Sequence, residues 1–234
     1  MNRGARAFLA TLLFAGAVAA LAIARHAPPD PLPADAPAEL FSAGRAREIL
    51  RRLVGNGAPH PIGSPENARV RREVARELSR LGYETSIQER FVCGSRYPVC
   101  ATAANVLARL PGRSTSRAVL LSAHYDSVGA GPGASDDGMG VAALLEIARI
   151  VRSEPPAKNP ILFLVDDGEE AGLLGADAFA SHHPWAKDVG AVVNVEGRGT
   201  GGASLLFETS DDNAWLIGLA ARPSETTWRS SVSV

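Results

Sequence analysis

Residues 160–167, with the sequence PILFLVDD, form a short and almost unbroken apolar run that ends in two aspartates. A run of this length and composition is typical of a strand buried on both faces of a sheet. Two further segments have the same form, LLSAHYD at 120–126 and VGAVVNVE at 189–196. We expect all three to be buried strands that carry polar residues at their carboxyl ends.

Helical patterns alternate with these strands along the chain. The spacing of apolar residues predicts helices at 42–54, 64–82, 139–152, 172–183 and from 213 onward. Further strands are predicted at 83–92, 102–110, 117–124 and 203–209. Strands that alternate with helices predict an α/β sandwich around a mostly parallel sheet, and no internal repeat is visible.

The totals of the chain exclude some classes of protein. The 234 residues suffice for one sizeable domain with an additional tail or anchor. The net charge is −1 and only 6% of the residues are aromatic. Neither a basic field nor a base-stacking surface is therefore expected, and we predict no nucleic-acid partner.

Residues 1–26 differ in composition from the rest. Arg3 and Arg6 precede an uncharged apolar stretch at 7–24, long enough to favour a membrane anchor. The triplet at 22–24, Ala-Ile-Ala, also resembles a signal-peptidase site, so a cleaved signal segment is the alternative. Both interpretations place the remaining chain outside the cytoplasm. A buried core helix is disfavoured because a Pro/Ala-rich linker follows at 27–40.

Cys93 and Cys100 are the only cysteines, in the segment CGSRYPVC. An even pair across a short Gly/Pro loop indicates a disulfide in an oxidising compartment. Two unrelated thiols are the alternative. A zinc site is disfavoured, since no histidine lies nearby in the sequence.

Ligands of open α/β sheets gather beyond the carboxyl ends of the strands. The polar side chains expected at that edge are His124, Asp126, Asp136, Asp137, Glu169, Glu170 and Glu196. Carboxylates crowded in this way repel one another unless they are protonated or neutralised by a cation. One aspartate of the pair at 136–137 suffices to cap the following helix, and the second is left over. The sequence therefore predicts a metal site.

Other interpretations of single motifs were weighed against this one. GAGPGA at 129–134 matches a loose dinucleotide pattern, but a pyrophosphate would meet two aspartates where it needs bare amides. SDDGMG does not supply acids at the alternate positions of an EF-hand loop. His182 and His183 lie late in a helix, and we interpret them as structural or surface residues.

At these motifs the sequence resembles the M28 family of zinc aminopeptidases, in particular the membrane-anchored branch of endoplasmic reticulum metallopeptidases. The resemblance covers residues from about 45 to about 221 and is carried by HYDS, PGASDD, GEE, HPW and NVEGRGTGG. M20 peptidases share the His-x-Asp and Glu-Glu elements but lack the Asp-Asp-Gly arrangement. The resemblance implies a zinc exopeptidase fold, a three-layer α/β/α sandwich around a mixed, mostly parallel sheet.

The resemblance also implies roles for individual residues. Two Zn²⁺ ions would be bridged by Asp136, and a cis peptide bond would join Asp136 to Asp137. One ion would be completed by His124 and Glu196, with Glu196 standing where many relatives have Asp, and the other would be bound by Glu170. Glu169 would be the general base. Asp126 would orient the ring of His124 without itself binding zinc.

One departure from the family pattern affects the expected function. The family places a further histidine on the second zinc, well after the Asn-x-Glu element, but no histidine follows His183 here. We therefore expect an incomplete peptidase domain at 41–221, a tail outside the family pattern at 222–234, and about one zinc held tightly.

The predicted function is zinc-dependent cleavage of N-terminal bonds in a peptide or small amide substrate. An inactive fragment that keeps the fold and one metal is the first alternative. A nucleotide-binding α/β module is the second.

Overall fold

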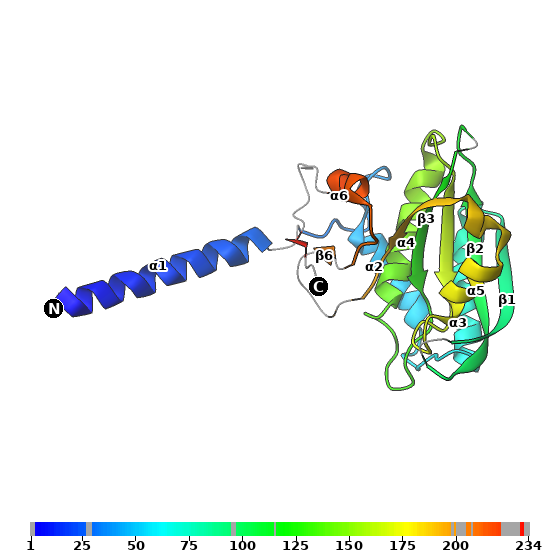
Figure 1. Cartoon of the computed structure of the whole chain (residues 1–234), viewed down its shortest axis with the longest axis horizontal. Coiled ribbons are helices and arrows are strands. Elements are labelled where there is room, and N and C mark those ends of the chain that lie inside the picture. Colours follow the sequence, from blue (N-terminus) through cyan, green and yellow to red (C-terminus); the bar gives the residue numbers. More distant parts are fainter. Residues whose placement is uncertain are drawn as a thin grey trace. The chain divides into compact units, whose positions relative to one another are not determined.

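The computed structural model describes residues 3–26, 30–94, 97–114, 116–197, 199, 205–206, 208–220 and 230–231. Residues Pro31–Gly199 form one compact unit, and the flanking segments Met1–Asp30 and Thr200–Val234 form another, which is described separately below. The larger unit contains a five-stranded sheet and the helices that cover it (Figure 1).

The sheet is mixed, with the strand order β1-β2-β4-β3-β5. Its strands are β1 (Thr85–Cys93), β2 (Cys100–Leu110), β3 (Ala118–His124), β4 (Ile161–Asp166) and β5 (Val189–Asn194). β3 pairs in parallel with both β4 and β5, whereas β1 pairs antiparallel with β2, and β2 pairs antiparallel with β4. The parallel part of the sheet is thus the part whose strand ends carry the predicted site.

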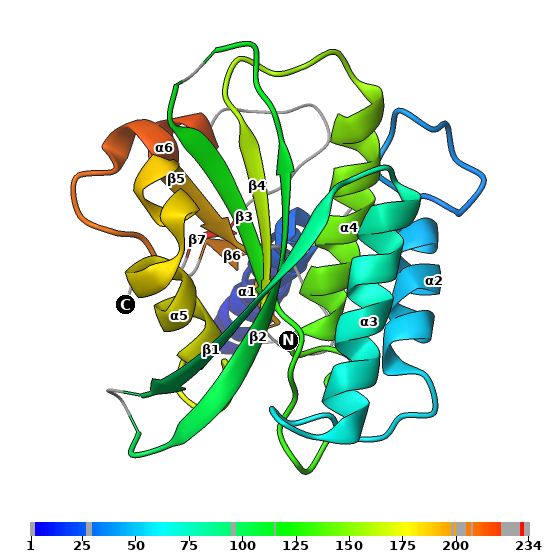
Figure 2. The same ribbon diagram turned by 90° about the vertical axis from the view of Figure 1, so that its right-hand side faces the viewer.

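Helices cover both faces of the sheet, which confirms the three-layer sandwich. Figure 2 shows α2 (Ala43–Val54), α3 (Pro65–Arg80) and α4 (Gly138–Ser153) on one face, with α5 (Leu174–His182) on the other. The 3₁₀ helix η1 (Pro184–Asp188) follows α5. The main core lies between the sheet and the three helices and includes Val74, Leu78, Leu144, Phe163 and Val165.

The helices begin where local sequence signals place them. Ser42 and Ser64 accept hydrogen bonds from the backbone N–H three residues later, and Pro65 occupies the first turn of α3. Each cap satisfies a donor that has no partner inside its helix. The predicted helices at 42–54, 64–82, 139–152 and 172–183 therefore agree with α2 to α5 within two residues at each end.

β1 and β2 form a hairpin whose antiparallel pairing was not predicted. Only residues 94–99 join the strands, which is too short for the crossover that a parallel pair needs. Cys93 and Cys100 are partners in the register and form a disulfide with an S–S distance of 2.07 Å. The bridge therefore closes the base of the connecting loop, at the turn end of the hairpin.

The expectation that 189–196 is a buried strand was wrong. β5 pairs only with β3 among the described residues and lies at the edge of the sheet. Val192 and Val193 are 50% and 44% exposed. An edge strand buries its faces only when elements beyond it cover them, and this condition cannot be inferred from an apolar run alone.

The flanking segments contain few regular elements. The helix α1 (Arg3–His26) includes a 22-residue stretch, Arg3–Ala24, with mean hydropathy 2.4. At 1.5 Å per residue such a helix is about 33 Å long, sufficient for a hydrocarbon core of about 30 Å. The helix expected from 213 onward is α6 (Ala214–Ala220). Of the strand expected at 203–209, only β6 (Leu205–Leu206) is described, in parallel with β7 (Ser230–Ser231), and residues 203, 204 and 207 lie outside the described residues.

Candidate metal centre and active site

The fold brings the predicted site residues together at one edge of the sheet. His124 ends β3 and is the register partner of Asp166, the last residue of β4. Glu169 and Glu170 follow β4 in the loop before α5, and Glu196 lies two residues beyond β5. Parallel strands end at the same edge, so residues far apart in the sequence converge there.

His124 lies at the centre of the cluster and is 2% exposed. Its Nε2 atom is 3.0 Å from Asp136 Oδ1, 3.5 Å from Glu196 Oε1 and 3.9 Å from Glu169 Oε2. Burial lowers the pKa of His124, but hydrogen bonds to Asp126 and Glu196 and the charges of Asp126 and Asp137 outweigh burial and raise the pKa to about 12. The ring therefore lies in a strongly negative environment.

Asp126 connects this histidine to the following loop. Its Oδ1 atom is 3.4 Å from His124 Nδ1, and its carboxylate accepts hydrogen bonds from the backbone N–H groups of Glu169 and Glu170, at 3.0 and 3.2 Å. Asp126 is 1% exposed. The contacts fit the orienting role proposed for Asp126, and they add a function that the sequence did not predict, because the same carboxylate also positions the backbone of both glutamates.

The two adjacent aspartates have different local roles. Asp137 is the N-cap of α4 and accepts a hydrogen bond from Gly140 N at 3.0 Å, which leaves Asp136 free to face His124. The peptide bond between Asp136 and Asp137 is cis, as the resemblance implied. Asp136 is therefore the aspartate that the capping argument leaves over.

Two groups of side chains have ligand atoms within 4.8 Å of one another. His124, Asp136 and Glu170 form the first group, and His124, Asp137 and Glu196 form the second. Asp137 was not among the predicted ligands. Among the ion pairs of the described residues, the only cationic partner of these carboxylates is His124.

The charges of the cluster fit a divalent cation. Asp137 Oδ2 is buried and has no hydrogen-bond partner within the part of the chain that the structure describes. Burial raises the pKa of Asp137 to about 8, and burial together with neighbouring carboxylates raises the pKa of Glu169 and Glu170. Burial raises the pKa of Glu196 as well, but hydrogen bonds from His124 and Gly197 N outweigh burial and lower it. The raised pKa values of the other three acids fit a cluster with little positive charge of its own, which a bound metal ion would supply.

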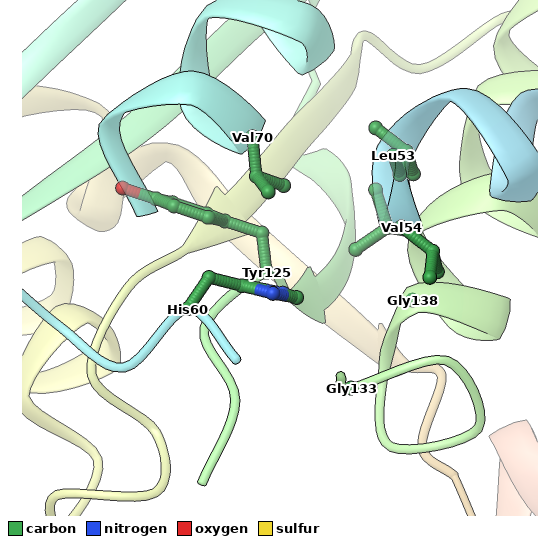
Figure 3. Close-up of a pocket in the computed structure, with 8 residues that line it drawn as sticks. Leu53, Val54, His60, Val70, Tyr125, Gly133 and Gly138 are labelled. Atoms are coloured by element: carbon green, nitrogen blue, oxygen red, sulfur yellow. The ribbon is translucent and has the colours of Figure 1, made fainter. Parts of the chain in front are cut away.

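The buried residue His60, in the loop between α2 and α3, supports the segment that leads to the aspartates. His60 N donates to Ser127 Oγ at 2.8 Å, and Ser127 N donates to His60 O at 3.3 Å. Figure 3 shows His60 beside Tyr125, with Gly133 on the neighbouring loop. A Cβ atom on Gly133, whose φ is +60°, would lie 2.8 Å from Ser127 Cβ. The void at this junction is about 10 Å³, which is too small for a substrate.

The two late histidines do not join the cluster. His183 stacks on Phe179, and its Nδ1 atom accepts a hydrogen bond from Trp185 N at 3.2 Å. Burial lowers the pKa of His183. His182 is exposed, and neither residue belongs to a group of candidate metal ligands among the described residues.

A larger cavity of about 610 Å³ lies on the α5 side of the sheet. His124, Asp166, Glu169 and Glu196 contribute to its lining, and most of the remaining lining is apolar and comes from β3, β4, β5, α5 and η1, together with Ser122, Asn194 and Lys187. The candidate metal centre is therefore adjacent to a space of substrate size.

The chain is similar to curated membrane proteases. It is 35% identical over 209 residues to a vacuolar membrane protease of Yarrowia lipolytica, covering 79% of this chain and 20% of that protein. It is 38% identical over 115 residues to endoplasmic reticulum metallopeptidase 1 of Mus musculus, covering 48% and 13%. The chain thus spans about a fifth or less of the length of these relatives.

Solved structures with the same fold include enzymes of two kinds. A Zn-dependent exopeptidase from Parabacteroides distasonis matches with a TM-score of 0.64 and 21% identity, covering 82% of this chain and 76% of that one. A glutaminyl cyclase from an Acidobacteriales bacterium matches with a TM-score of 0.67 and 19% identity, covering 88% and 77%. At these identities the matches establish the fold only.

The family model for peptidase family M28 matches residues 105–232, more than half of the sequence. This segment contains every predicted metal ligand, from His124 to Glu196. The chain therefore belongs to peptidase family M28.

Proposed function

We propose that this chain is a zinc-dependent aminopeptidase that hydrolyses the N-terminal bond of a peptide or small amide. The observation that carries the proposal is the convergence of one imidazole and several carboxylates beside a cavity of about 610 Å³, with no Lys or Arg among their ion pairs in the described residues. His124, Asp136, Glu170 and Glu196 would hold the metal, with Asp137 as a further candidate. When bound, Zn²⁺ lowers the pKa of a water molecule and polarises the scissile carbonyl.

Glu169 is proposed as the general base. It belongs to neither candidate metal group, and its carboxylate lies 3.9 Å from His124 Nε2. Its raised pKa suits a group that takes a proton from the attacking water and gives it to the leaving amine. Asp126 holds the backbone of this loop through Glu169 N and Glu170 N. Removal of the Asp126 contacts would misplace the base and a ligand together.

The proposal predicts activity toward substrates with a free N-terminus only. Leucine p-nitroanilide should be hydrolysed by the zinc-loaded chain, and its N-acetylated form should not. Chelation with EDTA should abolish hydrolysis, and added Zn²⁺ should restore it. Cleavage of the acetylated substrate at a similar rate would contradict the aminopeptidase assignment. Zinc binding without hydrolysis of either substrate would support the alternative of an inactive metal-binding fragment.

We also propose that α1 anchors the chain in a membrane with the peptidase unit on the extracytoplasmic side. The span Arg3–Ala24 has the required length and hydropathy, Arg3 and Arg6 mark the cytoplasmic end, and the similar proteins are named as membrane proteases. The chain should resist alkaline extraction from membranes, and deletion of residues 1–26 should release it. Protease added to the extracytoplasmic side of an intact membrane should cleave the peptidase unit. Cleavage only after the membrane has been permeabilised would contradict this topology.

A further inference from the structure

The lining of the cavity beside the candidate metal centre combines apolar and acidic side chains, and it also includes Ser122, Asn194 and Lys187. Its apolar surface comes from both the sheet and α5, and includes Leu120, Leu164, Leu173, Phe179 and Val192. Its acidic residues include Glu169 and Glu196, whose carboxylates lie near His124. A ligand that fills the cavity therefore needs a hydrocarbon part and a group that suits carboxylates.

Asp166 is the third acidic residue of the cavity lining. It is the last residue of β4, on the same face of the sheet as Leu164, because side chains two residues apart in a strand share a face. It lines the cavity, is 5% exposed and is the register partner of His124. Asp166 belongs to neither candidate metal group among the described residues.

The carboxyl group of Asp166 has no partner in the described part of the chain, where neither a hydrogen bond nor an ion pair joins it to another group. The neighbouring buried acids differ in this respect. Asp167 accepts hydrogen bonds from Asn67 Nδ2 at 2.8 Å and Ala104 N at 3.1 Å, and Asp126 accepts two from the loop after β4. Asp166 is thus a buried carboxyl that faces a cavity without a partner of its own.

A buried carboxyl without a partner is costly, and the cost falls when a ligand supplies a hydrogen-bond donor or a positive charge. We propose that Asp166 binds an ammonium group of the substrate's first residue, whose hydrocarbon part lies against the apolar side chains of the cavity lining. This inference rests on the proposed aminopeptidase function. It assigns substrate binding to an acid outside the candidate metal groups.

The ammonium group can be the α-amine or the end of a basic side chain, and four amides separate the two sources. Leucinamide carries only the α-amine, and 4-methylpentanamide is the same molecule without it. Lysinamide carries both amines, and 6-aminohexanamide retains only the one at the end of the side chain. Binding of each to the zinc-loaded full chain can be measured by calorimetry.

The test compares the wild-type chain with Asp166→Asn, which keeps the size of the side chain and removes its charge. The substitution should weaken binding of at least one ammonium-bearing amide by about tenfold or more, and leave 4-methylpentanamide unchanged. Asp177→Asn is the matched control, because Asp177 is an exposed residue of α5 that does not line the cavity. Zinc content and thermal midpoint establish that each variant is folded.

The pattern of losses identifies the source of the ammonium group. A selective loss for leucinamide assigns Asp166 to the α-amine, and a selective loss for 6-aminohexanamide assigns it to a basic side chain. Equal losses for all four amides, no loss for any, or no wild-type preference for the ammonium-bearing amides would overturn the proposal. If the ammonium-bearing amides bind selectively but the wild-type chain hydrolyses no substrate, the result counts against the proposed function alone. If the wild-type chain hydrolyses substrate but Asp166→Asn binds all four amides as the wild type does, the result counts against this inference alone.

Discussion

Replacing Glu169 by Gln is expected to lower kcat for peptide hydrolysis by about two orders of magnitude or more while the zinc content stays unchanged. Gln has nearly the same shape but cannot accept the proton of the attacking water. The loop should keep its position, because Asp126 holds it through the backbone N–H of residue 169, which the substitution retains. Zinc should be retained because Glu169 is in neither candidate metal group.

Glu170→Gln is the matched control, with the same chemical change one residue further along. Glu170 groups with His124 and Asp136 as a candidate ligand, so this variant should bind less zinc, and its activity should recover in part when zinc is added in excess. Elemental analysis and steady-state kinetics on both variants separate the two roles. Zinc loss in Glu169→Gln together with zinc retention in Glu170→Gln would show that the roles are reversed.

The helices and most strands could be predicted because their signals are local. Ser42 and Ser64 mark helix starts within a few residues, and the apolar run before Asp166 has the length of a buried strand. The burial of β5 could not be predicted in this way. Val192 and Val193 are as apolar as the residues of a central strand, but their exposure depends on which elements lie beyond the edge of the sheet.

The candidate site could be predicted in outline, since strand ends converge whatever the details of packing. The division of roles between Asp136 and Asp137 could be predicted only from the resemblance to the family, because a cap and a metal ligand require the same residue type at nearly the same place. The structure places the cap on Asp137 and also groups Asp137 with His124 and Glu196. A single carboxylate thus serves one interaction through Oδ1 and has its Oδ2 atom free for another.

Asp166 differs from these residues, because the sequence does carry a signal for its position. Alternation along β4 places Leu162, Leu164 and Asp166 on one face of the sheet, toward α5. By themselves, the aspartates after the apolar run indicate only an acidic strand end. The lack of a partner for the Asp166 carboxyl depends on the positions of surrounding side chains, which periodicity does not give.

Replacing Glu146 by Ala is expected to lower the free energy of unfolding by about 3 kcal/mol or more, because removal of one member of a buried ion pair leaves the opposite charge uncompensated. The Glu146 side chain is 1% exposed and accepts hydrogen bonds from Arg45 Nε at 2.9 Å, Arg149 Nε at 2.8 Å and Ser42 N at 3.1 Å. These contacts join the start of α2 to α4. Because α4 begins directly after Asp137, the same network supports the helix that carries the aspartate loop.

Urea unfolding measures this loss. The control is Glu154→Ala, which replaces an exposed glutamate at the end of α4 and should change the free energy of unfolding by less than about 0.5 kcal/mol.

The pH dependence of stability gives a second test. Burial raises the pKa of Glu146, but hydrogen bonds from Arg149 and Arg45 outweigh burial and lower it below its ordinary value. The stabilisation is therefore fully present above the unfolded pKa of about 4.3 and is lost as the pH falls through the lower folded value. Between pH 5 and the acid-unfolding limit the wild-type chain should lose more stability than Glu146→Ala. Parallel stability profiles for the two chains would show that the Glu146 carboxylate is not the charge that holds α2 to α4.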